Sequence, residues 1–350
     1  MRTEKAVPVG LVVAVAVVVL QALLVPLFAG PAANIGARDL PIAVAGPPDA
    51  VAPLVARLRA AGPGAFEVRV VADATAADTA IRQRDVYGAI VLDPTGPSLH
   101  IASAASPTVA TLLTQAATSL SSQPGAAPAQ SGATPSARAG AAVMAVRDVV
   151  GVDSDDPRGT GFAAGFLPLA LTGMAAGGLI FFLVRRRAAR VVALVTYAVL
   201  AGLVGAAVQH YWLGVLPGDY FAAAGVMALF ALAVPATMAG LAALFGPPGL
   251  GLGAAVMFLV GNALSGVTSA PELLPQPWGA AGQWLPIGAA GTLLRSVAYF
   301  DGHGGFGPVT VLTAYTIGGL ILVLVGRRGI ERRVDEAVVV PEPAPAVSVR

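Results

Sequence analysis

The side chains of this chain that could act as acids, bases or nucleophiles are few and scattered. There is no cysteine, and the three histidines, His100, His210 and His303, stand far apart without metal-ligand spacing. No serine, aspartate and histidine occupy a recognisable catalytic arrangement, and the single lysine, Lys5, rules out a phosphate-binding P-loop. The sequence therefore predicts a chain that is not an enzyme and that binds no metal or cofactor of its own.

Arginines are more informative, because they gather beside apolar segments. The stretch "RRRAAR" joins two apolar runs and brings Arg185, Arg186, Arg187 and Arg190 together. Such a cluster is typical of a cytoplasmic loop that sets membrane topology. It is also a candidate contact for anionic membrane lipid or for a cytoplasmic partner. The net charge of +2 gives no reason to expect a nucleic-acid partner.

A second candidate site is the stretch "SGVTSAPELLPQPWGAAGQWLPIGAAGTLLRSVAYFDG", residues 265–302. Its prolines interrupt any helix at the start, whereas "GAAGTLLRSVAYF" predicts a short amphipathic helix. Tryptophan prefers the membrane interface, so Trp278 and Trp284 favour a hairpin that dips into the membrane boundary.

One arginine lies inside this hairpin. Arg295 is expected to pair with Glu272 or Asp301, or to extend towards lipid headgroups. If the hairpin closes a path through the membrane, its polar and proline residues are the candidate gate. These candidates are Pro271, Glu272, Pro275, Pro286 and Arg295.

The elements that must position these residues are apolar helices. The 350 residues are 56% hydrophobic and 11% charged, whereas soluble domains are about 45–50% apolar and about 25% charged. A helix needs roughly 20 apolar residues to cross a bilayer. Six runs meet or approach this length: Val9–Phe28, Phe162–Val184, Val191–Leu213, Tyr220–Phe245, Leu250–Val267 and Val309–Val325.

The first run admits two interpretations. Arg2 and Lys5 precede it and small residues follow it, as in a secretory signal. Its apolar length, however, exceeds the roughly 7–15 residues of a signal core. The run is therefore predicted to be a retained anchor.

The placement of basic residues predicts the orientation. Those at 2–5, 185–190 and 327–333 fall on one side of six spans, which is then the cytoplasmic side of a cell (plasma) membrane. The fold class predicted is an α-helical polytopic membrane protein with both termini cytoplasmic. Its parts are a stub with the first helix (1–29), a small extracytoplasmic α/β domain (30–161), a five-helix domain (162–326) that includes an outer hairpin (268–307), and a cytoplasmic tail (327–350).

The outer domain alternates strands and helices, which predicts a small α/β sheet with parallel neighbours. The strands are expected at 40–46, 66–71 and 86–92, with 97–103 allowing a fourth, and the helices at 49–62, 74–85 and 106–120. The segment 121–141 is rich in Pro, Gly, Ser and Ala and is predicted to be a flexible insertion. A nucleotide site is not expected, since "AGPPDA" lacks the G-x-G-x-x-G pattern.

A few residues inside the spans carry local predictions. Gly173 and Gly177, four apart, predict a face for close helix packing. Pro235 predicts a kink. Asn262 is expected to form a hydrogen bond between helices, and His210, beside aromatic residues, to lie at the membrane interface.

The plan of one span, a large outer domain and five further spans resembles the ABC type-2 permease superfamily, including its phage-infection-protein-like branch. Local sequences add to the resemblance: "LPIAVAG" and "AIRQRDVYGAIVLDP" in the outer domain, and "GNALSGVTSAPELLPQPW", "WLPIGAAGTLLRSVAYFDG" and "GRRG" in the membrane part. The family features map to Gly261, Ser265, Gly266, Pro271, Leu285, Pro286, Arg295, Tyr299, Phe300 and Gly302.

The resemblance implies the permease subunit of an exporter. Such a subunit works as a homodimer or heterodimer with a separate cytoplasmic ATPase, so ATP would bind only to the partner, and the substrate would be hydrophobic or amphipathic. The link "RRRAAR" is, however, too short for much of the coupling helix that an ATPase normally contacts. An alternative therefore stays open, namely a non-transporting envelope membrane protein whose outer domain binds a partner or an envelope component.

Overall fold

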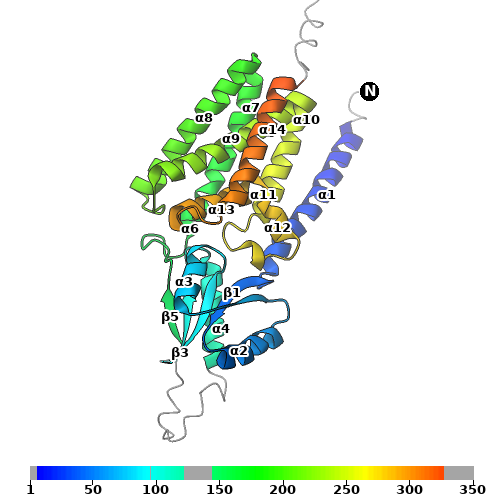
Figure 1. Ribbon diagram of the computed structural model, residues 1–350. Helices are drawn as coiled ribbons and strands as arrows, with labels where there is room; N and C mark the ends of the chain where they lie inside the picture. The colour runs from blue at the N-terminus through cyan, green and yellow to red at the C-terminus, as the bar shows by residue number, and fades with distance from the viewer. Residues whose placement is uncertain (1–5, 95, 122–143, 327–350) are drawn as a thin grey trace, which may run out of the picture.

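The computed structural model describes residues 6–94, 96–121 and 144–326, which form a helical bundle and a smaller sheet domain (Figure 1). Several sequence predictions fall outside the described residues. These are the basic residues at 2–5, the flexible insertion 121–141 except for Ser121, and the tail 327–350.

Six helices in the described residues are long and apolar enough to cross a membrane, which confirms the predicted number. Three of them are interrupted by a break or a π-helical turn. The fifth starts and ends earlier than predicted, at Pro247–Leu264. Their segments are α1 (Ala6–Ala33), α6 (Thr160–Ala164) with α7 (Phe166–Leu183), α8 (Arg187–Ala207) with η1 (Val208–Trp212), α9 (Tyr220–Phe245), α10 (Pro247–Ala254) with η2 (Ala255–Val260) and α11 (Gly261–Leu264), and α14 (Phe306–Val325).

Helix α9 is the centre of the bundle and packs against α7, α8, α10 and α14. The close approach depends on small side chains, as the predicted face on α7 illustrates. A Cβ atom on Gly177 would lie 2.8 Å from both the Pro235 carbonyl oxygen and the Met238 Cβ. This contact confirms the predicted packing face, because only glycine leaves room for the α9 backbone there. Helix α9 runs without interruption through Pro235.

Helix α1 stands apart from the other apolar helices and contacts α11 near the sheet domain (Figure 1). Its leucine and valine side chains are exposed along most of its length, for example Leu11 and Leu23. A water-soluble protein rarely exposes so continuous an apolar surface, so this surface fits a helix surrounded by lipid or by another apolar chain.

The sheet domain has five strands in the order β2-β1-β3-β4-β5. The parallel part, β2-β1-β3, matches the prediction. Strand β4 is antiparallel to β3, because only two residues join them and a parallel pair needs a long crossover. Strand β5 was not predicted. The strands are β1 (Leu40–Ala45), β2 (Phe66–Val71), β3 (Gly88–Asp93), β4 (Gly96–Ile101) and β5 (Ala145–Asp148).

Helices cover both faces of this sheet. Helices α2 (Pro48–Ala61) and α4 (Pro107–Ser121) pack on one face against residues such as Ile42 and Ile90. Helix α3 (Ala74–Arg82) packs on the other face, where Ala43 and Val91 point. Strands β1 and β3 are therefore buried on both sides, which explains their continuous apolar sequence.

The segment between the fifth and sixth apolar helices lies between the bundle and the sheet domain (Figure 1). It contains a 3₁₀ turn, η3 (Pro271–Leu273), and two helices, α12 (Trp278–Gln283) and α13 (Pro286–Tyr299). The predicted short helix is confirmed as α13, but it does not lie on a surface. Most of its residues are buried, because α9, α14 and α12 pack against it, and Arg84 of the sheet domain contacts its Thr292 and Ser296. Trp278 and Trp284 are exposed.

Candidate ligand cavity between the sheet domain and the bundle

The sheet domain is fastened to the segment that follows α11. Ala270 and Leu273 enter the apolar core on one face of the sheet, and Phe300 enters the core on the other face. Backbone hydrogen bonds add to this contact: the Arg38 N–H donates to the Glu272 carbonyl at 3.0 Å. Because both cores are shared, the position of the domain on the bundle is set by packing rather than by a flexible tether.

Beside these contacts lies a half-open cavity of about 690 Å³, called here the inter-domain cavity. Its walls come from the loop between α3 and β3, from residues 266–272, from α12 and α13, and from the start of α14. Most of the lining is apolar and includes Val86, Val267, Ala280, Trp284 and Val311. A volume of about 300–1,000 Å³ with a few polar groups is typical of small-molecule sites.

Arg295 is the most deeply placed charge of this cavity, since its exposed fraction is 7%. Its Nη2 donates to the Val267 carbonyl at 2.9 Å, and its guanidinium lies 5.0 Å from the centre of the Phe162 ring. Neither Glu272 nor Asp301 forms an ion pair with it among the described residues, so the predicted pairings are wrong, whereas its extension towards lipid headgroups stays a prediction. Burial and the neighbouring Arg84 lower the pKa of Arg295 to about 10, so the group is charged at neutral pH.

Arg84 is the second arginine of the cavity, and it was not among the predicted site residues. It follows α3 with a left-handed φ of 61°. Its Nη1 donates to the Thr292 carbonyl at 3.0 Å and to the Ser296 hydroxyl at 2.6 Å, and its guanidinium lies 5.2 Å from the Phe300 ring centre. Burial lowers the pKa of Arg84 as well. The sheet domain thus places a guanidinium against α13.

Two carboxylates also belong to this cavity. Glu272 accepts a hydrogen bond of 2.8 Å from the Tyr87 hydroxyl. Burial first, and then Glu272, raise the pKa of Tyr87, which keeps the phenol neutral and donating. Asp85 is exposed at the rim. Neither carboxylate is within ion-pair distance of Arg84 or Arg295, so both guanidinium groups keep free donors.

The predicted gate residues divide into two groups. Pro271, Glu272 and Arg295 line the inter-domain cavity. Pro286 instead begins α13, and the Pro275 carbonyl caps the start of α12 by accepting from the Trp278 N–H at 2.9 Å. The gate itself stays a prediction, but only the first three residues are in position to contact a ligand.

The four arginines of the "RRRAAR" cluster fall into two pairs, one bound to helix ends of the same chain and one exposed. Arg187 donates to the Leu324 carbonyl at 2.8 Å and to the Gly326 carbonyl, whereas Arg190 donates to the Val184 and Phe181 carbonyls. These are the free carbonyls at the ends of α14 and α7, which cations stabilise. The remaining pair, Arg185 and Arg186, is exposed and available to lipid or to a partner.

Two further polar residues of the spans, His210 and Asn262, carried sequence predictions. His210 donates to the Leu216 carbonyl at 2.7 Å and lies against Tyr211 and Tyr220, while its place at the membrane interface stays a prediction. Asn262 is exposed, and its side chain forms no hydrogen bond to another helix among the described residues. Its predicted helix–helix bond is therefore wrong.

Sequence reasoning missed one polar cluster inside the sheet domain. His100 Nδ1 lies 2.6 Å from Asp78 Oδ1, and His100 Nε2 lies 3.3 Å from the Ser98 hydroxyl. The order is that of a catalytic triad, but Arg147 occupies the second Asp78 oxygen at 3.2 Å. Neither described cavity is lined by these residues. The cluster is therefore assigned to structure, because it joins α3 to β4 and β5.

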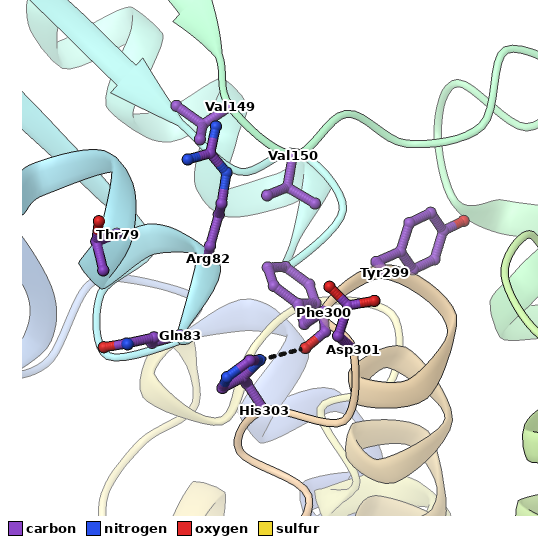
Figure 2. Close-up of a pocket in the computed structure, with 9 residues that line it drawn as sticks. All are labelled: Thr79, Arg82, Gln83, Val149, Val150, Tyr299, Phe300, Asp301 and His303. Carbon is purple, nitrogen blue, oxygen red and sulfur yellow. Dashed lines mark hydrogen bonds between the residues drawn. The ribbon is translucent and has the colours of Figure 1, made fainter. Parts of the chain in front are cut away.

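A smaller cavity of about 420 Å³ is lined by Phe300 and lies between the end of α3, the chain after β5 and the turn after α13 (Figure 2). Figure 2 shows His303, whose Nδ1 donates to the Phe300 carbonyl at 2.7 Å. The charged residues of this cavity, Arg82 and Asp301, are exposed and hydrated. It consequently lacks the buried, unpaired charge that distinguishes the inter-domain cavity.

Among the described residues no group of three or more His, Cys, Asp or Glu side chains is arranged to hold a metal ion. The arrangement of the inter-domain cavity can bind a molecule, and it offers positive charge beside apolar walls. Comparisons with protein-family models, with curated proteins and with solved structures give no match for this chain. The fold and the cavity define a helical protein suited to a membrane, with a sheet domain packed over one end of its bundle.

Proposed function

We propose that this chain is the membrane-spanning permease subunit of an exporter that moves a hydrophobic or amphipathic substrate outward. The observation that supports the proposal is the inter-domain cavity, which combines mostly apolar walls with a few polar groups. It lies at the end of the bundle, under a domain that packs over that end. A molecule leaving the apolar phase would meet such a cavity before it reached water.

The proposed orientation puts the sheet domain outside the cell (plasma) membrane and both termini in the cytoplasm. The start of α1 and the end of α14 lie at the end of the bundle remote from the sheet domain (Figure 1). Arg187 contacts the end of α14, so the "RRRAAR" cluster lies there too. Basic residues favour the cytoplasmic side, which supports this orientation.

The orientation is testable because the chain has no cysteine. Single cysteines at two exposed positions, Asp49→Cys in α2 and Arg186→Cys before α8, would be labelled in intact cells with a membrane-impermeant thiol reagent. We expect labelling at position 49 and none at position 186 until the membrane is opened. The reverse result would contradict the orientation.

Energy for export would come from a separate cytoplasmic ATPase, as in the ABC type-2 permeases that the sequence resembles. The exposed apolar sides of α1 and α8 leave surface for a second subunit, in a homodimer or heterodimer, as well as for lipid. Affinity purification of the chain is expected to recover an ATPase, and a deletion strain is expected to retain an amphipathic compound that the parent strain releases. Unchanged release together with no recovered ATPase would contradict the proposal.

One observation favours a second candidate function, a non-transporting envelope protein whose outer domain binds a partner or an envelope component. The link between α7 and α8 spans only Val184–Arg186, and Arg187 and Arg190 are bound to helix ends of the same chain. This short link leaves little exposed surface for an ATPase to contact. Recovery of an envelope component without an ATPase would favour this alternative.

A further inference from the structure

We propose that the inter-domain cavity binds the anionic head of an amphipathic molecule, with Arg84 and Arg295 contacting the head and the apolar walls contacting its chain. This inference rests on the proposed function in one respect, because it names the substrate class of the same site. The shared chemistry of the head is a phosphate or a carboxylate, either of which a guanidinium binds through two parallel N–H donors.

The first argument is the free donors. Arg295 uses only Nη2 and Arg84 uses only Nη1 for hydrogen bonds to protein acceptors among the described residues. The Nε atom and the other terminal nitrogen of each guanidinium have no protein acceptor there. Both residues line the cavity. An enclosed cation normally has an ion-pair partner, since an unpaired buried charge is costly.

The second argument is the mutual repulsion of the two arginines. They come from different parts of the fold, Arg84 from the sheet domain and Arg295 from α13, and the positive charge of Arg84 acts unfavourably on Arg295. Aromatic rings of Phe300 and Phe162 lie under the two guanidinium groups and offset part of this cost. An anion between them would relieve the rest, so the cavity is electrostatically complementary to a negative head.

The third argument concerns the carboxylates, of which Glu272 attracts Arg84 but only from beyond ion-pair distance. Glu272 is held by the Tyr87 hydroxyl, and Asp85 is exposed to water at the rim. A cationic ligand would have to pass two guanidinium groups that carry no counter-charge at ion-pair distance. The interior therefore selects an anion.

The fourth argument is the apolar wall, which requires more than a free anion. Trp284 and Phe306 line the cavity and are 72% and 85% exposed, so they lie at its rim. Val267 and Val311 lie further in, and Pro308 adds to the same wall. Aromatic rims are suited to the membrane boundary, where a chain can remain in the apolar phase while its head enters. The occupant is accordingly amphipathic.

The experiment uses the full chain in a phosphatidylcholine nanodisc, with no ATPase present. The chain has three tryptophans, so Trp212→Phe and Trp278→Phe leave Trp284 at the cavity as the fluorescent reporter. Four probes are titrated: dodecyl phosphate, dodecanol, dodecyltrimethylammonium and inorganic phosphate. We expect dodecyl phosphate to bind at least about tenfold more tightly than any of the other three, because a hydrogen bond to a charged group is worth about tenfold or more. A second anionic arm with dodecanoate separates a phosphate head from a carboxylate head.

Matched variants test the two arginines. Arg295→Gln and Arg84→Gln are each expected to weaken dodecyl phosphate binding by about 10- to 100-fold. Arg82→Gln is the control, because Arg82 lies two residues from Arg84 but faces the smaller cavity and is exposed. It is expected to leave binding unchanged. Arg295→Lys keeps the charge without the planar fork and is expected to give intermediate affinity.

The outcomes separate this inference from the proposed function. Equal binding of all three dodecyl probes, no binding of the anionic ones, or tight binding of inorganic phosphate alone overturns the inference, whichever variants fold. If anionic probes bind as expected but deletion of the gene changes no release, the permease proposal fails and the inference stands. If release depends on the chain while the anionic probes do not bind, the inference alone fails.

Discussion

In the described part of the chain two charged clusters each form around a buried residue, Asp78 within the sheet domain and Arg295 between that domain and the bundle. In the first, Asp78 receives His100 on one oxygen and Arg147 on the other. In the second, Arg84 and Arg295 face a cavity without a carboxylate at ion-pair distance. Both clusters join elements far apart in sequence, yet only the first is closed, in the sense that both oxygens of its central carboxylate have a partner.

The difference teaches how to tell structural from ligand-binding polarity. A buried cluster whose donors and acceptors are all matched makes the fold more specific and gives a ligand nothing to bind. A cluster with unmatched charge costs stability in the empty protein and lowers that cost when a complementary ion enters.

The largest change in stability is expected from Asp78→Ala, which removes the carboxylate at the centre of the closed cluster. His100 and Arg147 lose their shared acceptor, and His100 is left with an unpaired buried nitrogen. The expected destabilisation is about 2–3 kcal/mol, visible as a lower thermal midpoint of the purified chain. The exposed pair Arg69–Glu67 supplies the control, since Arg69→Ala should change stability by less than about 1 kcal/mol. Similar effects of the two changes would show that the closed cluster adds no more than a surface ion pair.

Arg295→Met is expected to stabilise the ligand-free chain, whereas Asp78→Ala is expected to destabilise it. Replacing an unpaired buried charge with an apolar side chain of similar length removes the cost of burying it, at the loss of one hydrogen bond to Val267. We expect the thermal midpoint of the ligand-free chain to rise, by about 1–2 kcal/mol of stability. Dodecyl phosphate should raise the midpoint of the wild type and not that of the variant. A lower midpoint for ligand-free Arg295→Met would mean that Arg295 is structural, like Asp78.

The smallest effect is a pH dependence above neutrality. Burial raises the pKa of Tyr87 and raises the pKa of Tyr299 to about 12. In the unfolded chain the same phenols begin to lose their protons at about pH 10, so at higher pH the folded chain holds protons that the unfolded chain has lost. Their contribution to stability is complete below about pH 10 and is lost as the pH rises. Arg295 acts with the opposite sign, since its lowered pKa of about 10 relieves the cost of its charge over the same range.

Two variants separate these contributions. Tyr87→Phe is expected to reduce the fall in thermal midpoint between about pH 8 and about pH 11, whereas Arg295→Met is expected to enlarge it. Phenolate absorbance gives an independent reading, because Tyr87→Phe should remove one late-ionising phenol. Identical alkaline profiles for both variants would contradict the assigned signs.

The features that were predicted correctly are those encoded within single segments. The six apolar helices follow from runs of uncharged residues, and the alternation in the sheet domain follows from local periodicity. Gly177 was also predictable, since small residues four apart make one face of a helix. Strand β5 was missed because it is only four residues long, is exposed and follows a segment rich in Pro, Gly, Ser and Ala.

The candidate site divides in the same way. Arg295 and Glu272 stood out in sequence because charges are rare in that apolar stretch, but their expected partners were wrong. Glu272 accepts a hydrogen bond from the Tyr87 hydroxyl, and Arg295 donates one to the Val267 carbonyl. Arg84 lies in the stretch "AIRQRDVYGAIVLDP", but nothing in that stretch distinguishes it from Arg82, so it was not singled out.

By itself, the sequence determined which segments are apolar helices, which alternate as strands, and where the basic residues lie, because hydropathy and charge are properties of short stretches. Only the tertiary structure decided that α13 is buried rather than superficial, that Asp78 meets His100, and that Arg84 reaches Ser296 across 212 positions of sequence. The physical reason is that a site between two domains depends on how their cores pack together, and that packing is fixed by contacts no single segment contains.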